Sequence, residues 1–179
     1  MARISDDELI RHLTPPPGIR IAPYPARRDR IYRFSLLFTG IGLLGETIAA
    51  FVHQSLALSV FQAWVSIGLV MAGWTFLVWL PSWRWLVRGL VTAGLLLWPF
   101  TSIGGWALSL AGAAIMAAKE THCFHFWAGR VIPWAVILLG VTLVIPPAHV
   151  AAPFAWLLLT VLWAFLLQGR WQLPLLEVH

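Results

Sequence analysis

The chain has 179 residues, of which 60% are hydrophobic and only 11% are charged, and its mean hydropathy is +0.81. A soluble domain of this length would have too few polar residues to cover so much apolar surface, which excludes the ordinary soluble globular class. The net charge of +5 is compatible with nucleic-acid binding, but the placement of the basic residues explains it without such a partner.

The first segment, residues 1–32, is polar and has no apolar core of the kind found in a cleavable signal peptide. Ser5 and Glu8 predict a capping box at the start of a short amphipathic helix. The run 15–17 is all proline and predicts a tether along the membrane surface. We therefore expect a cytoplasmic segment here, and a first apolar segment that inserts as an anchor.

Apolar runs bounded by turn signals predict an all-α bundle of six transmembrane helices. The stretch 84–118 would be about 50 Å long as one helix, against a hydrocarbon core of about 30 Å. Two short helices that turn at Pro99 fit better. The expected spans are 33–53, 57–80, 84–99, 103–119, 131–146 and 152–169.

The basic residues give the orientation of these spans. With six spans and a cytoplasmic N-terminus, all twelve Lys and Arg fall on or beside the cytoplasmic face, as the positive-inside rule requires. Five spans would place Lys119, Arg130 and Arg170 outside. We therefore expect a transmembrane domain over 33–169 and a cytoplasmic tail over 170–179. Membrane lipids then account for the basic balance, and no nucleic acid is needed.

The tryptophans and small residues predict how the bundle is anchored and packed. The twelve tryptophans gather near both expected interfaces and predict an aromatic belt, with Trp106 and Trp156 in its outer half. The span 103–119 has a stripe of small residues that favours close helix contact. This stripe predicts either a central helix or an ordinary contact with one neighbour. Its members are Gly105, Ser109, Ala113 and Ala117.

Glu46 is the one acidic residue that lies deep in an expected span, about 20 Å along the first helix. An ionised carboxylate there costs at least ~2.5 kcal/mol, so we expect it to face the interior, paired or protonated. His53 lies seven residues later on nearly the same face, and His149 lies at a similar depth. These three residues are candidates for a proton-handling or tetrapyrrole-binding site. The alternative is that both histidines are solvated at the interface.

The segment 119–130 concentrates reactive side chains between two apolar spans. Carboxylate, imidazole and thiolate are ligand types that zinc accepts, although the spacing matches no established metal motif. The candidate metal ligands are Glu120, His122, Cys123 and His125. The alternative is a capped cytoplasmic turn, and its expected binding surface is Lys119, Phe124, Trp127 and Arg130. The topology places this segment on the opposite side of the membrane from His53 and His149.

The stretch 117–124 joins small residues to Lys119-Glu120 and then to Cys123-Phe124. This pattern, with an early intramembrane glutamate, resembles an uncharacterised family of integral membrane proteins. That family is a domain of unknown function common in cyanobacteria and other photosynthetic lineages. The resemblance covers about residues 32–168 and implies a multi-pass protein of the bacterial plasma membrane or the thylakoid membrane. It implies no activity.

The sequence contains no phosphate-binding loop, dinucleotide fingerprint, nucleophile elbow or c-type haem motif. We therefore expect no catalytic domain, and the leading hypothesis is an accessory or assembly partner of a larger membrane complex. One alternative is a membrane protein that binds haem, chlorophyll or a divalent metal through the residues above. A third hypothesis is a small proton-coupled transporter that uses Glu46.

Overall fold

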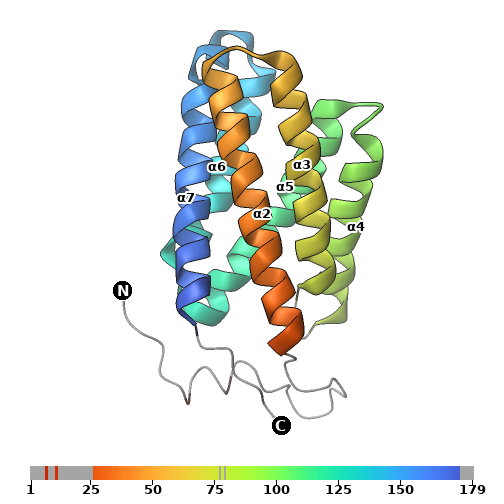
Figure 1. Ribbon diagram of the computed structural model, residues 1–179, viewed down its shortest axis with the longest axis vertical. Coiled ribbons are helices and arrows are strands. Elements are labelled where there is room, and N and C mark those ends of the chain that lie inside the picture. Colours follow the sequence, from red (N-terminus) through yellow and green to blue (C-terminus); the bar gives the residue numbers. More distant parts are fainter. Residues whose placement is uncertain (1–6, 8–10, 12–25, 77, 79, 174–179) are drawn as a thin grey trace.

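A computed structural model describes residues 7, 11, 26–76, 78 and 80–173 of the chain. The predicted amphipathic helix and proline-rich tether lie almost entirely outside these residues. The described part is all-helical, with no strand (Figure 1). Its elements are α2 (Ala26–Phe51), α3 (Ser55–Thr75), α4 (Pro81–Leu97), α5 (Ser102–Phe124), α6 (Trp127–Val144), the 3₁₀ helix η1 (Pro146–Ala151) and α7 (Ala152–Gln172).

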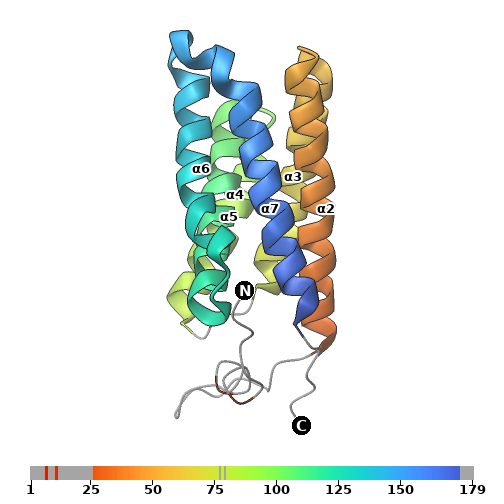
Figure 2. The ribbon, with the colours of Figure 1, turned by 90° about the vertical axis from the view of Figure 1, so that its left-hand side faces the viewer.

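The helices run alternately up and down, so the start of α2 and the end of α7 lie at the same end of the bundle (Figures 1 and 2). We call this the lower end, and it also holds the α3–α4 and α5–α6 connections. The upper end holds the α2–α3 and α4–α5 connections and η1. Side chains from distant parts of the sequence therefore meet at each end.

Five of the described segments are long and apolar enough to cross a membrane, which suggests that the protein is embedded in one. The fold class is thus confirmed as all-helical, and its long apolar helices are compatible with a membrane protein. The division of the stretch 84–118 is also confirmed, because α4 ends at Leu97 and α5 begins at Ser102. The first helix begins at Ala26, seven residues before the predicted span.

The connection between α5 and α6 differs from the prediction of a polar loop over 119–130. Helix α5 continues to Phe124 and α6 begins at Trp127, so only two residues connect them. His125 ends α5 in the left-handed conformation, with φ of 56°. His53 ends α2 in the same way, with φ of 55°. Histidine is one of the non-glycine residues that adopt this conformation more often than most, which gives both residues a role in ending helices.

The small-residue stripe of α5 packs inside the bundle. A Cβ atom added to Gly105 would lie 2.5 Å from the backbone oxygen of Gly94, so α4 and α5 approach closely there. Ser109 and Ala117 are fully buried. Helix α5 contacts α3, α4 and α6, so it packs against more than the single neighbour that one of the two alternatives required.

Candidate functional site

Glu46 lies in the interior of the bundle, where three helices meet. Its side chain is fully buried. Its Oε1 accepts a hydrogen bond from Nε1 of Trp106, and its Oε2 accepts one from Nε1 of Trp156, both at 2.9 Å. Trp106 belongs to α5 and Trp156 to α7. The carboxylate of α2 therefore joins these two helices.

Both partners of Glu46 are neutral donors, because an indole N–H donates a hydrogen bond and carries no charge. Among the described residues, no Lys, Arg or His forms an ion pair with this carboxylate. The two indoles can solvate the group, but they cannot balance a negative charge. The site therefore gives each oxygen of the carboxyl group one hydrogen-bond donor, and the described residues supply no counter-charge.

A pocket of about 260 Å³ lies at the upper end, beyond Glu46 on α2, and Glu46 itself is not one of its lining residues. His53, His149 and Trp156 are among its lining residues. Ala49 and Ala50 also line it, and they follow Glu46 by three and four residues, about one helical turn. The pocket therefore reaches to within one turn of Glu46, and Trp156 belongs to both the pocket wall and the carboxylate site.

The structure thus brings His53 and His149 to one pocket, with Glu46 just below it. Both imidazoles are exposed, and Nε2 of His149 lies 3.1 Å from the backbone oxygen of Leu143. The remaining lining side chains are mostly small and apolar. Ligand pockets usually measure about 300–1,000 Å³, so this pocket suits a small molecule better than a tetrapyrrole.

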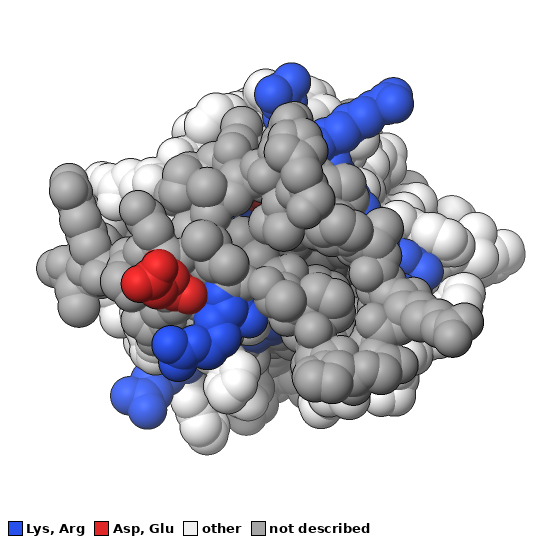
Figure 3. Space-filling model, turned by 90° about the horizontal axis from the view of Figure 1, so that it is seen from below, with Lys and Arg blue, Asp and Glu red and all other residues white. Residues whose placement is uncertain are grey.

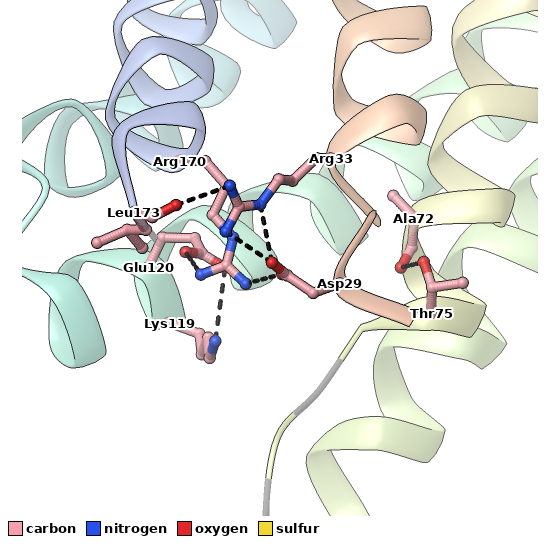
Figure 4. Close-up of polar contacts among 8 residues, drawn as sticks. All are labelled: Asp29, Arg33, Ala72, Thr75, Lys119, Glu120, Arg170 and Leu173. Atoms are coloured by element: carbon pink, nitrogen blue, oxygen red, sulfur yellow. Dashed lines mark hydrogen bonds and ion pairs between the residues drawn. The ribbon is translucent and has the colours of Figure 1, made fainter. Parts of the chain in front are cut away.

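A buried ion cluster occupies the lower end (Figure 4). Asp29 pairs with Arg33 at 2.7 Å and also with Arg170. Arg170 in turn pairs with Glu120 at 3.3 Å, and Lys119 lies 3.5 Å from the same carboxylate. The cluster consists of Asp29, Arg33, Lys119, Glu120 and Arg170, and it joins α2, α5 and α7. These are the same three helices that meet at Glu46.

The ion cluster is shielded from solvent. Arg170 is only 2% exposed, and its guanidinium group lies 4.7 Å from the centre of the Phe124 ring. Arg33 donates a hydrogen bond to the backbone oxygen of Leu173 at 2.9 Å. Removal of one partner from a buried ion pair leaves an uncompensated charge and is strongly destabilising. The cluster therefore fixes the lower ends of the three helices.

The structure disperses the residues predicted as a metal site. Glu120 is fully buried in the ion cluster, His122 and His125 are exposed, and Cys123 is half-buried. Within the described ranges, no group of three or more His, Cys, Asp and Glu residues is arranged to hold a metal ion.

The predicted binding surface also changes. Phe124 is 4% exposed and packs beneath Lys119 and Arg170, so it belongs to the interior. Trp127 and Arg130 are exposed.

The sequence analysis missed the partners of both buried carboxylates. It assigned Trp106 and Trp156 to an interfacial belt, and this assignment is wrong, because each is only 2% exposed. The sequence analysis placed Glu46 and both tryptophans in the outer half of the membrane. Because a carboxylate in the membrane needs hydrogen-bond donors, indole N–H groups at that depth were candidate partners. The Asp29–Arg33 pair has the spacing of four residues that is typical of helical ion pairs. Nothing in the sequence connects Arg170 to Glu120.

The fold and the site define a class: a helical bundle of membrane-protein type with a buried carboxylate site between three helices. Comparisons of the chain with protein-family models, with curated proteins and with solved structures gave no match. The functional argument therefore rests on the residues themselves.

Proposed function

We propose that this chain is a six-helix integral membrane protein with cytoplasmic termini, which binds a small organic cation in exchange for a proton. The orientation rests on the basic residues of the bundle, which lie in the turns nearest the lower end. Helix α4 has 17 residues and is about 25 Å long. Arg84 and Arg88 in its first turns can extend to the headgroups, so α4 serves as the sixth span.

One observation supports this function: the carboxylate of Glu46 accepts hydrogen bonds from two neutral indoles, and one of these indoles also lines a pocket. A buried, ionised Glu46 is costly in the membrane interior, so the proposal gives it a proton while the pocket is empty. When a cation binds, the carboxyl O–H bond breaks and the proton leaves to water. The carboxylate then balances the charge of the cation.

The pocket wall favours a cation with an apolar body. Trp156 offers an indole ring next to the carboxylate, and indole is the aromatic group that attracts cations most strongly. The other lining residues, such as Ala50, Leu58 and Pro153, are apolar and suit a hydrocarbon group. A small aromatic or aliphatic ammonium ion combines both properties.

Binding of benzylammonium, with neutral benzyl alcohol as the matched probe, tests this function. We expect wild-type protein in detergent to bind benzylammonium, and Glu46→Gln to weaken that binding at least about tenfold, the equivalent of one charge-assisted hydrogen bond. Asp7→Asn makes the same chemical change on an exposed residue and should bind normally. Equal binding of benzylammonium by wild type and Glu46→Gln would refute the proposal.

The accessory role predicted from the sequence remains a separate prediction. It was motivated by the expected lack of a catalytic domain, the high aromatic content and the small-residue stripe of α5, and that stripe is buried within the chain. Crosslinking in native membranes tests it, and a partner captured specifically would support it. The haem and chlorophyll alternatives through His53 and His149 are tested by the visible spectrum of the purified protein.

A further inference from the structure

A second polar site lies at the lower end, where α3 ends at Thr75 and α4 begins at Pro81. The backbone oxygen of Trp74 accepts hydrogen bonds from Arg28 at 3.0 Å and from Arg88 at 3.2 Å. Two guanidinium groups that share one carbonyl oxygen lie close together, although their like charges repel. Arg84 adds a third positive charge nearby, through a bond to the backbone oxygen of Val78 at 3.1 Å.

The charges of Arg84 and Arg88 are not balanced within the described structure. The two residues are four apart on α4 and therefore share a helix face, where like charges destabilise each other. Neither forms an ion pair with a described Asp or Glu. Each guanidinium group has five N–H donors, and the Nε of each is buried without a hydrogen-bond partner in the described part of the chain.

Two tryptophans flank these arginines. The guanidinium group of Arg88 lies 5.0 Å from the ring centre of Trp74 and 5.3 Å from that of Trp85. Trp74 is 48% exposed and Trp85 is 63% exposed. Exposed indoles at the end of a spanning helix are typical of the headgroup level of a membrane. The site thus combines positive charge with groups that partition to the lipid interface.

Capping of α3 explains only part of this arrangement. Arginine side chains near a helix C-terminus bond its last carbonyl groups and stabilise the helix dipole. One arginine would be enough for the Trp74 oxygen. Capping does not require a second guanidinium on that oxygen, a third at Arg84, or exposed indoles on both sides of Arg88.

We propose that Arg84 and Arg88, with Trp74 and Trp85, bind the phosphate group of an anionic phospholipid. A phosphate accepts parallel hydrogen bonds from guanidinium groups and balances their charge. The indoles contact the glycerol and upper acyl region of the same lipid. Figure 3 shows the lower end of the bundle, with basic side chains around its margin. The site is separate from the pocket beside Glu46 and does not depend on the proposed function.

Native mass spectrometry with phosphatidylglycerol, and with phosphatidylcholine as the neutral lipid, tests this site. We expect the Arg84→Gln/Arg88→Gln variant to bind phosphatidylglycerol at least about 30-fold more weakly than wild type, because it loses two charge-assisted guanidinium–phosphate contacts. The matched control is Arg27→Gln/Arg30→Gln, which removes two charges from exposed positions in α2 at the same end. It should bind nearly as tightly as wild type.

A further variant keeps the charges, in case the double variant does not fold. Trp85→Leu should weaken phosphatidylglycerol binding several-fold while both arginines remain. The proposal is overturned if the two double variants weaken binding equally, or if wild type binds phosphatidylcholine as tightly as phosphatidylglycerol. It is also overturned if millimolar inorganic phosphate displaces the lipid completely, because the site would then be one for a soluble anion.

Discussion

The two ends of the α2–α5–α7 interface hold their carboxylates in different ways. At the lower end, Asp29 and Glu120 are matched by arginine and lysine within the ion cluster. Towards the upper end, the partners of Glu46 among the described residues are two neutral indole donors, and one of them, Trp156, also lines the pocket. The lower end therefore pairs each of its two carboxylates with basic side chains, three in all. The upper site holds a buried carboxyl group without a described basic partner.

Replacement of one carboxylate by an amide at each end should give the largest difference in the free energy of unfolding. Glu120→Gln removes one of the two carboxylates of the ion cluster and leaves Asp29 to face three basic side chains. We expect it to lower the free energy of unfolding by about 3–5 kcal/mol. Glu46→Gln should cost no more than about 1–3 kcal/mol, the penalty of one unpaired indole N–H. Thermal or denaturant unfolding in detergent measures both. An equal cost for the two substitutions would contradict the comparison.

A second prediction concerns the packing of the upper half, where the described residues form no ion pairs. Close backbone packing between α4 and α5 replaces them there, so Gly105→Ala should cost about 1–3 kcal/mol through overpacking. The control is Gly140→Ala, where an added Cβ atom meets nothing within 4 Å. That change should raise the stability by up to about 1 kcal/mol through helix propensity. An equal change in thermal stability for the two variants would contradict the close contact between α4 and α5.

A third and smaller effect reports the charge state of Glu46. Trp156→Phe keeps the ring and removes the N–H group that bonds Glu46. Trp163→Phe removes an equivalent bond to the neutral backbone oxygen of Leu36, at 2.9 Å. If Glu46 carries a proton while the pocket is empty, both variants should cost about 1 kcal/mol. A cost for Trp156→Phe that is clearly larger than for Trp163→Phe would indicate an ionised carboxylate.

Much of the fold could be predicted from the sequence, because hydrophobic run length and proline or glycine breaks reflect local physical constraints. The division at Pro99 follows from helix length against the thickness of the bilayer. The inward position of Glu46 follows from the cost of exposing a polar group to lipid. The extension of α5 to Phe124 could not be predicted, because the polar stretch 119–124 is equally compatible with a helix and with a loop.

The site was less predictable, because its partners are distant in sequence. Trp156 is 110 residues from Glu46, and Arg170 is 141 residues from Asp29. No local pattern marks either pair. The predicted helix spans gave the approximate depth of these residues in the membrane. Which side chains meet at a given depth depends on how the helices pack, and the sequence does not reveal this.

The central claim is that Glu46 exchanges a proton for a cation, and proton release on ligand binding tests it most directly. Benzylammonium is added to purified protein in weakly buffered solution that contains a pH indicator, with benzyl alcohol as the control. The account predicts that wild type releases protons in proportion to the benzylammonium bound, and that Glu46→Gln releases none. Binding of benzylammonium by wild type without proton release would contradict it.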